Sequence, residues 1–145
     1  SVTREEFVKI IVAAFDLADE EVSCEFEDVS KDRWSYPYIA AASKLGIVSG
    51  DGVSFNPAAG ISRQDMAVII CRVLEYSGAK VSGEAIGFSD DADISDYAKD
   101  AVETLTAAGI INGMGDGTFA PGGTVTRAQA AKVVYGLFGL VGGGK

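Results

Sequence analysis

The sequence predicts a mainly α-helical protein built from helix-loop-helix repeats, in which short β-hairpin or loop segments join the helices. Three observations support this prediction. The phrase GDGVSFNPAAGISRQ at residues 50–64 returns as GDGTFAPGGTVTRAQ at residues 115–129. Apolar residues recur with the helical period near 3.6, and hydroxyl residues that can cap a helix stand directly before these patterns.

The repeats divide the chain into two and a half units. Residues 2–5 align with residues 61–64, and a helix-like apolar pattern follows both, so the start of the chain matches only the second half of a repeat. We therefore expect a piece of a longer or processed protein. Its expected parts are a half repeat at 1–20, complete repeats at 26–77 and 88–140, a linker at 78–87 and a flexible tail at 141–145.

Each complete repeat begins with a predicted leading helix. Ser35 or Asp32 can start the first of these helices, and Gly46 ends it. Ser95 starts the second, and Gly109 ends it. A Gly-Asp-Gly turn follows each leading helix, and its residues favour the positive φ angles of a tight hairpin or loop.

Each repeat continues with a trailing helix whose start is the clearest local signal in the chain. The words TREE at 3–6, SRQD at 62–65 and TRAQ at 126–129 each place a hydroxyl residue at the N-cap. The side chain three residues later can return a hydrogen bond, which makes a capping box, and Asp65 is the weakest version of it. Apolar faces follow all three words, so each trailing helix must pack against another element.

Composition excludes several classes of function. The chain has 145 residues, of which 48% are hydrophobic, so it can bury a core. The formal charge of −9 argues against nucleic acid as a partner, because such binding depends on basic patches. The longest apolar runs are too short for membrane insertion, and no motif calls for a cofactor. We expect the two cysteines, Cys24 and Cys71, to be plain thiols, although a bridge between them stays open.

Arginine occupies the first position of all three trailing helices, as Arg4, Arg63 and Arg127. A cation is unfavourable there, because a helix N-terminus already carries partial positive charge. One explanation is a surface ion pair with a nearby carboxylate such as Asp28 or Asp90. The other is a receptor for a carboxylate or phosphate, built from the guanidinium group and the free amides of the helix start.

Two aromatic residues and four glycines complete the candidate ligand-binding residues. Trp34 and Tyr97 occupy matching places, expected just inside the leading helices, either as core residues or as flat surfaces for a sugar ring. The glycines serve turn geometry and can also let a ligand approach the backbone closely. These glycines are Gly50, Gly52, Gly115 and Gly117.

The chain resembles S-layer homology domains over nearly its whole length. The resemblance rests on the order of its motifs, which is F-x-D, an aromatic residue, Gly-Ile, Asp-Gly-x-Phe-x-Pro and finally Ser/Thr-Arg. These modules hold bacterial surface proteins on the cell wall. The resemblance implies a pseudo-threefold, largely helical arrangement with ligand-binding grooves between repeats. It also implies non-covalent binding of an anionic secondary cell-wall polysaccharide, often through a pyruvylated sugar, with Arg4, Arg63 and Arg127 facing the acidic group.

The chain departs from the family pattern in three ways. The glutamate of the family's Thr-Arg-Ala-Glu word is present only as Glu6, and Asp65 and Gln129 replace it in the other repeats. Tyr97 stands where the family has tryptophan. The leading half of the first repeat is missing, so we expect other copies or a further segment to complete the threefold arrangement.

Other functions have weaker support. Residues 91–95 copy the start of an EF-hand loop, but Asp96 and Val102 replace its required glycine and glutamate. The C-terminal Gly-rich run follows a helix and opens none, unlike a phosphate-binding loop. The sequence has no histidine for a catalytic triad. Paired carboxylates stay formally open, but the acids that cluster at residues 25–28 and 90–93 give no hint of two carboxylates on opposite sides of a cleft, so we do not expect an enzyme. The alternative to glycan binding is a protein-protein module that assembles a surface layer.

Overall fold

The computed structural model describes residues 1–19, 21–49, 53–81, 83–84 and 86–141, which form a mainly α-helical fold as predicted. The described residues contain a single 3-10 turn, η1 (Asp91–Asp93), and only isolated β-bridges, so the segments between the helices are loops without strands. The helices are α1 (Arg4–Ala14), α2 (Tyr36–Lys44), α3 (Arg63–Ser77), α4 (Asp96–Ala107) and α5 (Arg127–Leu140).

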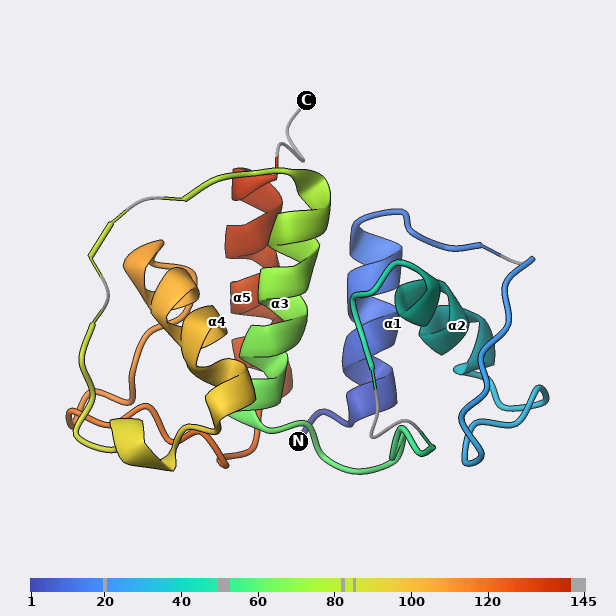
Figure 1. The fold of residues 1–145 in the computed structure, drawn as a ribbon, viewed down its shortest axis with the longest axis horizontal. Helices are drawn as coiled ribbons and strands as arrows, with labels where there is room; N and C mark the ends of the chain where they lie inside the picture. Colours follow the sequence, from blue (N-terminus) through green and yellow to red (C-terminus); the bar gives the residue numbers. More distant parts are fainter. Residues whose placement is uncertain (20, 50–52, 82, 85, 142–145) are drawn as a thin grey trace.

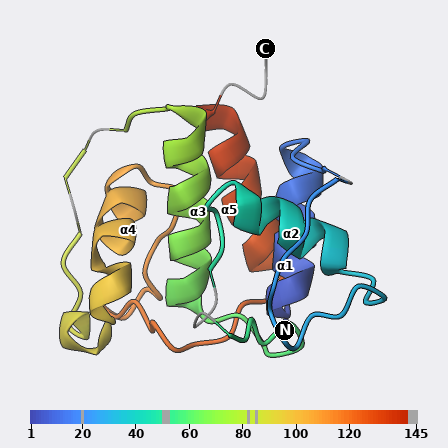
Figure 2. The ribbon, with the colours of Figure 1, turned by 45° about the vertical axis from the view of Figure 1, so that its right-hand side comes forward.

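The trailing helices α1, α3 and α5 stand side by side and begin at the same end of the molecule (Figure 1). The leading helices α2 and α4 lie on the outside, against α1 and α3 respectively. The view in Figure 2 shows α5 between α3 and α1. Each leading helix therefore packs against the trailing helix of the preceding repeat, so the packed helix pairs cross the repeat boundaries seen in the sequence.

Backbone hydrogen bonds join the three helix starts. The N–H of Val2 donates to the carbonyl of Val125 at 2.8 Å, and the N–H of Ile61 donates to the carbonyl of Val2 at 2.9 Å. These three side chains are buried, with at most 1% of their surface exposed. The start of α1 thus meets the starts of both other trailing helices, and antiparallel bridges join Thr3 to Gly60 and Ser62 to Thr124.

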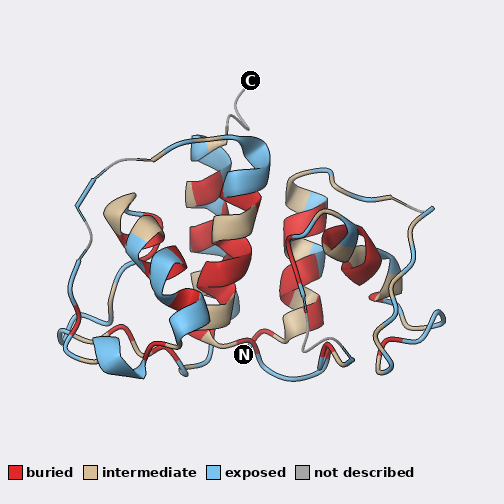
Figure 3. Ribbon diagram, in the orientation of Figure 1, coloured by how far each residue is buried: buried red, intermediate tan, exposed pale blue. Residues whose placement is uncertain are grey.

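Buried faces of the helices form one continuous core (Figure 3). Phe7 and Ile11 of α1, Met66 and Ile70 of α3 and Leu137 of α5 are fully buried in it. The helical period of the apolar residues thus predicted the inward faces of the three trailing helices correctly.

The recurring Phe-x-Asp and Phe-x-Pro words are two parts of one loop structure. The Asp28 carboxylate accepts hydrogen bonds from the backbone N–H groups of Phe55 and Asn56, at 2.9 and 2.8 Å. The Asp90 carboxylate does the same for residues 119–120, at 2.9 Å each. Two charge-assisted bonds per loop fix the position of a buried phenylalanine, which explains the spacing of these words in both repeats.

The helix ends follow the sequence signals closely. Thr3 and Thr126 form complete capping boxes, whereas the Ser62 side chain accepts a hydrogen bond from the Asp65 N–H but the Ser62 N–H donates none to the short aspartate side chain. Ser35 and Ser95 are the N-caps of α2 and α4, but neither side chain makes a capping hydrogen bond. Gly46 and Gly109 adopt left-handed φ angles of 76° and 75° just after these helices, as a C-terminal stop requires.

Within the described residues, no helix is both long enough and apolar enough to span a bilayer. Cys24 and Cys71 are free thiols, and burial raises the pKa of both. Between α3 and η1, parts of the expected linker at 78–87 lie outside the described residues, as does the expected tail from residue 142 onward.

The outer face of α5 differs from the corresponding faces of α1 and α3. The position nine residues after the N-cap is Val12 in α1, Cys71 in α3 and Tyr135 in α5. Val12 is buried and Cys71 is half-buried, whereas Tyr135 is 83% exposed. In the described part of the chain, no helix covers α5 as α2 covers α1. Leu140 is exposed as well, and so in part is Phe138, whose ring packs against Phe15, so large apolar side chains stay exposed on α5.

Gly113 offers a test of the loop structure. A Cβ atom added there would lie 2.6 Å from Cε1 of Phe88 and 2.8 Å from the backbone oxygen of Thr118. We expect Gly113→Ala to lower the free energy of unfolding by about 1–3 kcal/mol, because a backbone atom must move to relieve the overlap. Gly122→Ala is the matched control, since a Cβ atom there meets nothing within 4 Å. Equal stability of the two variants in urea unfolding would contradict this description of the loop.

Candidate functional site

Arg4 joins the first trailing helix to the loop of the next repeat. Its Nε donates to the carbonyl of Phe55 at 2.9 Å, and its guanidinium carbon lies 4.7 Å from the centre of the Phe55 ring. Its NH1 donates to Oδ2 of Asp65 at 2.9 Å. The arginine therefore contacts both a loop and a helix of the second repeat, which fixes its guanidinium group at the junction.

Arg63 makes the equivalent contacts one repeat later. Its Nε donates to the carbonyl of Phe119 at 2.7 Å, and its guanidinium carbon also lies 4.7 Å from the ring of that residue. Its NH2 donates to the carbonyl of Asn112 at 2.8 Å. The residue that corresponds to Asp65 is Gln129, and no carboxylate within the described residues lies at ion-pairing distance from Arg63.

Arg127 is at the third junction and is much more open. Its NH2 donates to Oε2 of Glu6 at 2.7 Å, and 69% of its side chain is exposed. Glu6 occupies the same helical position as Asp65, so the arginine of each repeat faces the third residue of the next trailing helix in a cyclic order. The described residues contain no loop that packs on Arg127 as residues 53–59 pack on Arg4.

The observed ion pairs correct two expectations about the arginines. Asp28 and Asp90 hold the loops through backbone N–H groups, so the carboxylate partners of Arg4 and Arg127 are Asp65 and Glu6 instead. The amides at the starts of α1 and α3 are not free either. The N–H groups of residues 4–5 and 63–64 donate to carbonyls of the Phe-x-Pro loops at 2.8–3.0 Å.

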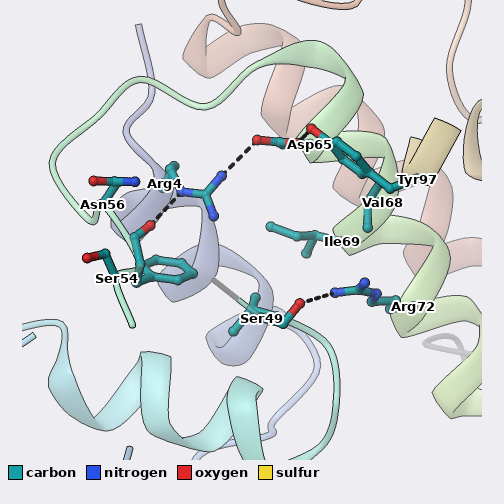
Figure 4. A pocket seen from close by; sticks show the side chains of 11 residues that line it. Arg4, Ser49, Ser54, Asn56, Asp65, Val68, Ile69, Arg72 and Tyr97 are labelled. Atoms are coloured by element: carbon teal, nitrogen blue, oxygen red, sulfur yellow. Dashed lines mark hydrogen bonds and ion pairs between the residues drawn. The ribbon is translucent and has the colours of Figure 1, made fainter. Parts of the chain in front are cut away.

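The Arg4 groove is the larger of two related cavities, with a volume of about 490 Å³. Figure 4 shows Arg4 between the loop and Asp65, with Arg72 bonded to Ser49 farther along the cavity. The charged residues among the described lining are Arg4, Arg72 and Asp65, so their net charge is +1. Its lining comprises Arg4, Val48, Ser49, Ser54, Phe55, Asn56, Asp65, Val68, Ile69, Arg72 and Tyr97.

The Arg63 groove is the corresponding cavity one repeat later, with a volume of about 230 Å³. Arg63 and Lys132 give its charged residues a net charge of +2, and none of the described residues that line it is a carboxylate. Only 6% of Arg63 is exposed, and burial lowers the pKa of its guanidinium group while the charge of Asp90 opposes that shift. Its lining comprises Arg63, Met66, Ile110, Ile111, Asn112, Gly113, Met114, Gln129, Lys132 and Val133.

The two candidate aromatic residues occupy different surroundings. Tyr97, the second residue of α4, lines the Arg4 groove and donates its hydroxyl hydrogen to Oδ1 of Asp65 at 2.5 Å. Burial, followed by the contact with Asp65, raises the pKa of Tyr97 to about 12, so the hydroxyl stays protonated. Trp34 precedes α2, lines neither groove and is 50% exposed, with Nζ of Lys9 lying 5.6 Å from its ring centre.

The candidate glycines are turn residues where the structure describes them. Gly115 and Gly117 adopt left-handed φ angles of 89° and 90°, as the turn requires, and line neither groove. Gly50 and Gly52 lie outside the described residues.

A buried polar cluster positions the leading helix on α1. Arg33 donates from Nε and NH2 to the Glu5 carboxylate at 2.8 and 3.0 Å, and the Ser35 hydroxyl donates to the same carboxylate at 2.6 Å. The arginine contact holds the pKa of Glu5 below its usual value. On α3 the equivalent residue Gln64 accepts a hydrogen bond from the N–H of Ser95 at 2.9 Å. The Glu5 contacts hold the start of α2 on α1, and the Gln64 contact holds the start of α4, which bears Tyr97, on α3.

The residues that distinguish the grooves are the third residues of the trailing helices. The sequence indicated Asp65 and Gln129 only as capping residues, because their second role depends on an arginine from another repeat. Lys132 and Arg72 could have been found by counting helical positions, since both follow the capping residues on the same helix face. The described residues contain no group of three or more potential metal ligands.

The profile of the S-layer homology domain matches residues 25–67 and 87–131, which together cover more than half of the chain. The chain belongs to the S-layer homology domain family. The two matched segments begin before the leading helices and end within α3 and α5, so each covers a leading helix, the loop after it and the start of a trailing helix.

Relatives carry this S-layer homology segment within much longer proteins. The chain is 41% identical to an amylopullulanase of Thermoanaerobacterium thermosulfurigenes and 40% identical to exoglucanase XynX of Acetivibrio thermocellus, over 94% of its own length in each case. It is 31% identical over 91% of its length to the S-layer protein sap of Bacillus anthracis. The chain spans 8%, 13% and 16% of these relatives respectively.

Acid should weaken the loop that bears the Arg63 groove. Hydrogen bonds from the Phe119 N–H and then the Ala120 N–H hold the pKa of Asp90 below its usual value. Since the folded pKa is the lower one, this stabilisation is present above the unfolded value of about 3.9 and is lost as pH falls through the folded pKa. We expect Asp90→Asn to reduce the loss of thermal stability between about pH 5 and pH 3.

The control for this measurement is Asp100→Asn, which removes an exposed carboxylate from α4. Thermal unfolding followed by circular dichroism across this pH range compares the two variants with the parent chain. Identical pH dependence of the Asp90 variant and the parent would rule out a role for Asp90 in holding the loop.

Proposed function

We propose that this chain anchors a bacterial surface protein non-covalently to the cell wall by binding an anionic, pyruvylated secondary cell-wall polymer in the grooves between repeats. The observation that carries the proposal is the Arg63 groove, where a buried guanidinium group and Lys132 line a cavity whose described lining includes no carboxylate. A cavity of this kind favours an acidic substituent, because solvent screens the buried guanidinium charge weakly and the exposed lysine adds a second positive charge to the lining.

The range of relatives supports anchoring over catalysis. Proteins named as an amylopullulanase, an exoglucanase and an S-layer protein share this segment, although their names describe different roles. A segment common to all three has a role other than the catalysis named in the first two. Attachment to the cell surface is a role that each of them can use, and the proposed location of this chain is therefore the cell wall.

Local charge explains how an acidic protein can bind an acidic polymer. The chain carries a formal charge of −9, which repels a polyanion at long range. At physiological ionic strength this repulsion is screened beyond about 8 Å. The grooves then act at contact distance through the cationic groups within them, and binding should depend on the polymer's acidic groups.

Lys132→Glu tests this mechanism without touching the buried arginine. Reversing the charge of this exposed groove residue should weaken binding of a pyruvylated wall disaccharide by about tenfold or more, equivalent to about 1.4 kcal/mol. Lys80→Glu makes the same change of net charge at an exposed residue that lines neither groove, and it should leave binding unchanged. Titration calorimetry measures both variants.

Failure of the unsubstituted chain to bind either this disaccharide or purified wall polymer would refute the proposed function. Equal weakening by both substitutions would show that net charge, and not the groove, governs the interaction.

The exposure of Tyr135 on α5 favours the second candidate function, assembly with other copies in a surface layer. Tyr135 is 83% exposed, whereas the corresponding residues Val12 and Cys71 are buried and half-buried. Assembly through this side of α5 should appear as concentration-dependent association in sedimentation experiments without any polymer. Tyr135→Glu should abolish it, and a monomer at all concentrations would exclude this candidate.

A further inference from the structure

The three trailing helices differ in their second residue, which is Glu5 in α1, Gln64 in α3 and Ala128 in α5. The first two lie where a leading helix begins, and each makes a different contact there. Neither of them lines the Arg4 groove or the Arg63 groove. The second position therefore serves the contact between a trailing helix and the leading helix that covers it.

Glu5 is a carboxylate buried under the start of α2. Only 6% of Glu5 is exposed, and its two oxygens accept hydrogen bonds from Nε and NH2 of Arg33 and from the fully buried hydroxyl of Ser35. A carboxylate at this depth needs a paired cation, because removing one partner of a buried ion pair is strongly destabilising. The start of α1 therefore fits a covering segment that supplies a cation at this point.

Gln64 makes an uncharged contact with the start of α4. Its Oε1 accepts a hydrogen bond from the backbone N–H of Ser95 at 2.9 Å. This contact needs no cation, because both partners are neutral. An arginine brought to this point would meet an amide in place of the carboxylate that Glu5 supplies.

The two leading helices carry a matching difference. They align on the glycines that follow them, Gly46 and Gly109. In this alignment Asp96 stands at the position of Arg33, and its side chain is fully exposed in its own repeat. If α4 covered α1, Asp96 would take the place of Arg33 beside the buried Glu5. Two carboxylates would then meet where an ion pair now forms, which disfavours this pairing.

The choice of partner matters because the repeats are alike. The structure pairs α2 with α1 and α4 with α3, although short loops also join α2 to α3 and α4 to α5 within each repeat. A slip by one repeat would place Arg33 against Gln64 and the start of α4 against Ala128, which has no polar side-chain atom. Wrong pairing of this kind, within one chain or between copies, is a characteristic failure of repeat proteins.

We propose that the second residue of a trailing helix is a pairing address, which selects the leading helix that covers it. Glu5 accepts the start of α2 and rejects that of α4, and Gln64 accepts the start of α4 without a cation. Ala128 gives α5 neither address, so the leading helices of this chain gain no side-chain hydrogen bond there. The addresses fix the register of the repeats, and the register in turn decides which loop lies over Arg4 and which over Arg63.

An exchange of the addresses tests the proposal in the whole chain. The partial exchange, Glu5→Gln with Gln64→Glu, moves the carboxylate to α3 but leaves its arginine on α2. The full exchange adds Arg33→Asp and Asp96→Arg, so that each address again matches its leading helix. We expect the partial exchange to lower the midpoint of urea unfolding and the full exchange to recover most of that loss, because matched pairs are restored.

Trp34 is the only tryptophan of the chain and reports the register directly. Its ring centre lies 5.6 Å from Nζ of Lys9 on α1, and the position of Lys9 on α3 is occupied by Val68. Nuclear Overhauser effects between the Trp34 ring and Lys9 should be present in the parent chain and in the full exchange. In the partial exchange they should weaken, and effects between the Trp34 ring and Val68 should appear.

Gly113→Ala is the matched control, since it strains a loop and changes neither address. It should lower stability and keep the contact between Trp34 and Lys9. Failure of the full exchange to recover stability would show that Glu5 and Arg33 serve only local packing on α1. The selective role would also be refuted if the folded partial exchange kept the Trp34–Lys9 contact at full strength, or if Gly113→Ala weakened that contact equally.

Discussion

The insertion of a first-position arginine into the next repeat is the interaction on which the rest of the structure depends. Arg4 and Arg63 each donate to the carbonyl of a loop phenylalanine and lie over its ring, while the adjoining helix-start amides donate to the same loop. This set of contacts explains why a cation occurs at an otherwise unfavourable helical position. It also brings a loop and two trailing helices together around each guanidinium group, and the grooves form where they meet.

A consequence of this geometry is that sequence repeats and packed units do not coincide. The leading helix and loop of one repeat cover the trailing helix of the preceding repeat, as α2 covers α1 and α4 covers α3. The Glu5 carboxylate and the Gln64 amide, each at the second helical position, bind the start of the covering segment. The exposure of Arg127 and Tyr135 follows from the same rule, because no such segment covers α5 among the described residues.

Local signals predicted the helices well, whereas contacts between repeats could not be predicted from one sequence. Thr3, Ser62 and Thr126 cap the trailing helices where the capping words place them, and Gly46 and Gly109 follow the leading helices with left-handed φ angles. The partners of the arginines depend on which residues of a neighbouring repeat face them, and sequence spacing does not contain that information. Asp65 therefore seemed to be only a weak capping residue, although its carboxylate binds Arg4 and Tyr97.

The central claim is that the buried charge of Arg63 receives its counter-charge from an acidic sugar of the cell wall. Side-chain NMR of selectively labelled arginine and glutamine during titration with a pyruvylated wall disaccharide measures this most directly. The account predicts that the Nε–H signal of Arg63 and the amide signal of Gln129 shift together as the disaccharide is added. Binding that leaves the Arg63 signal unchanged would contradict it.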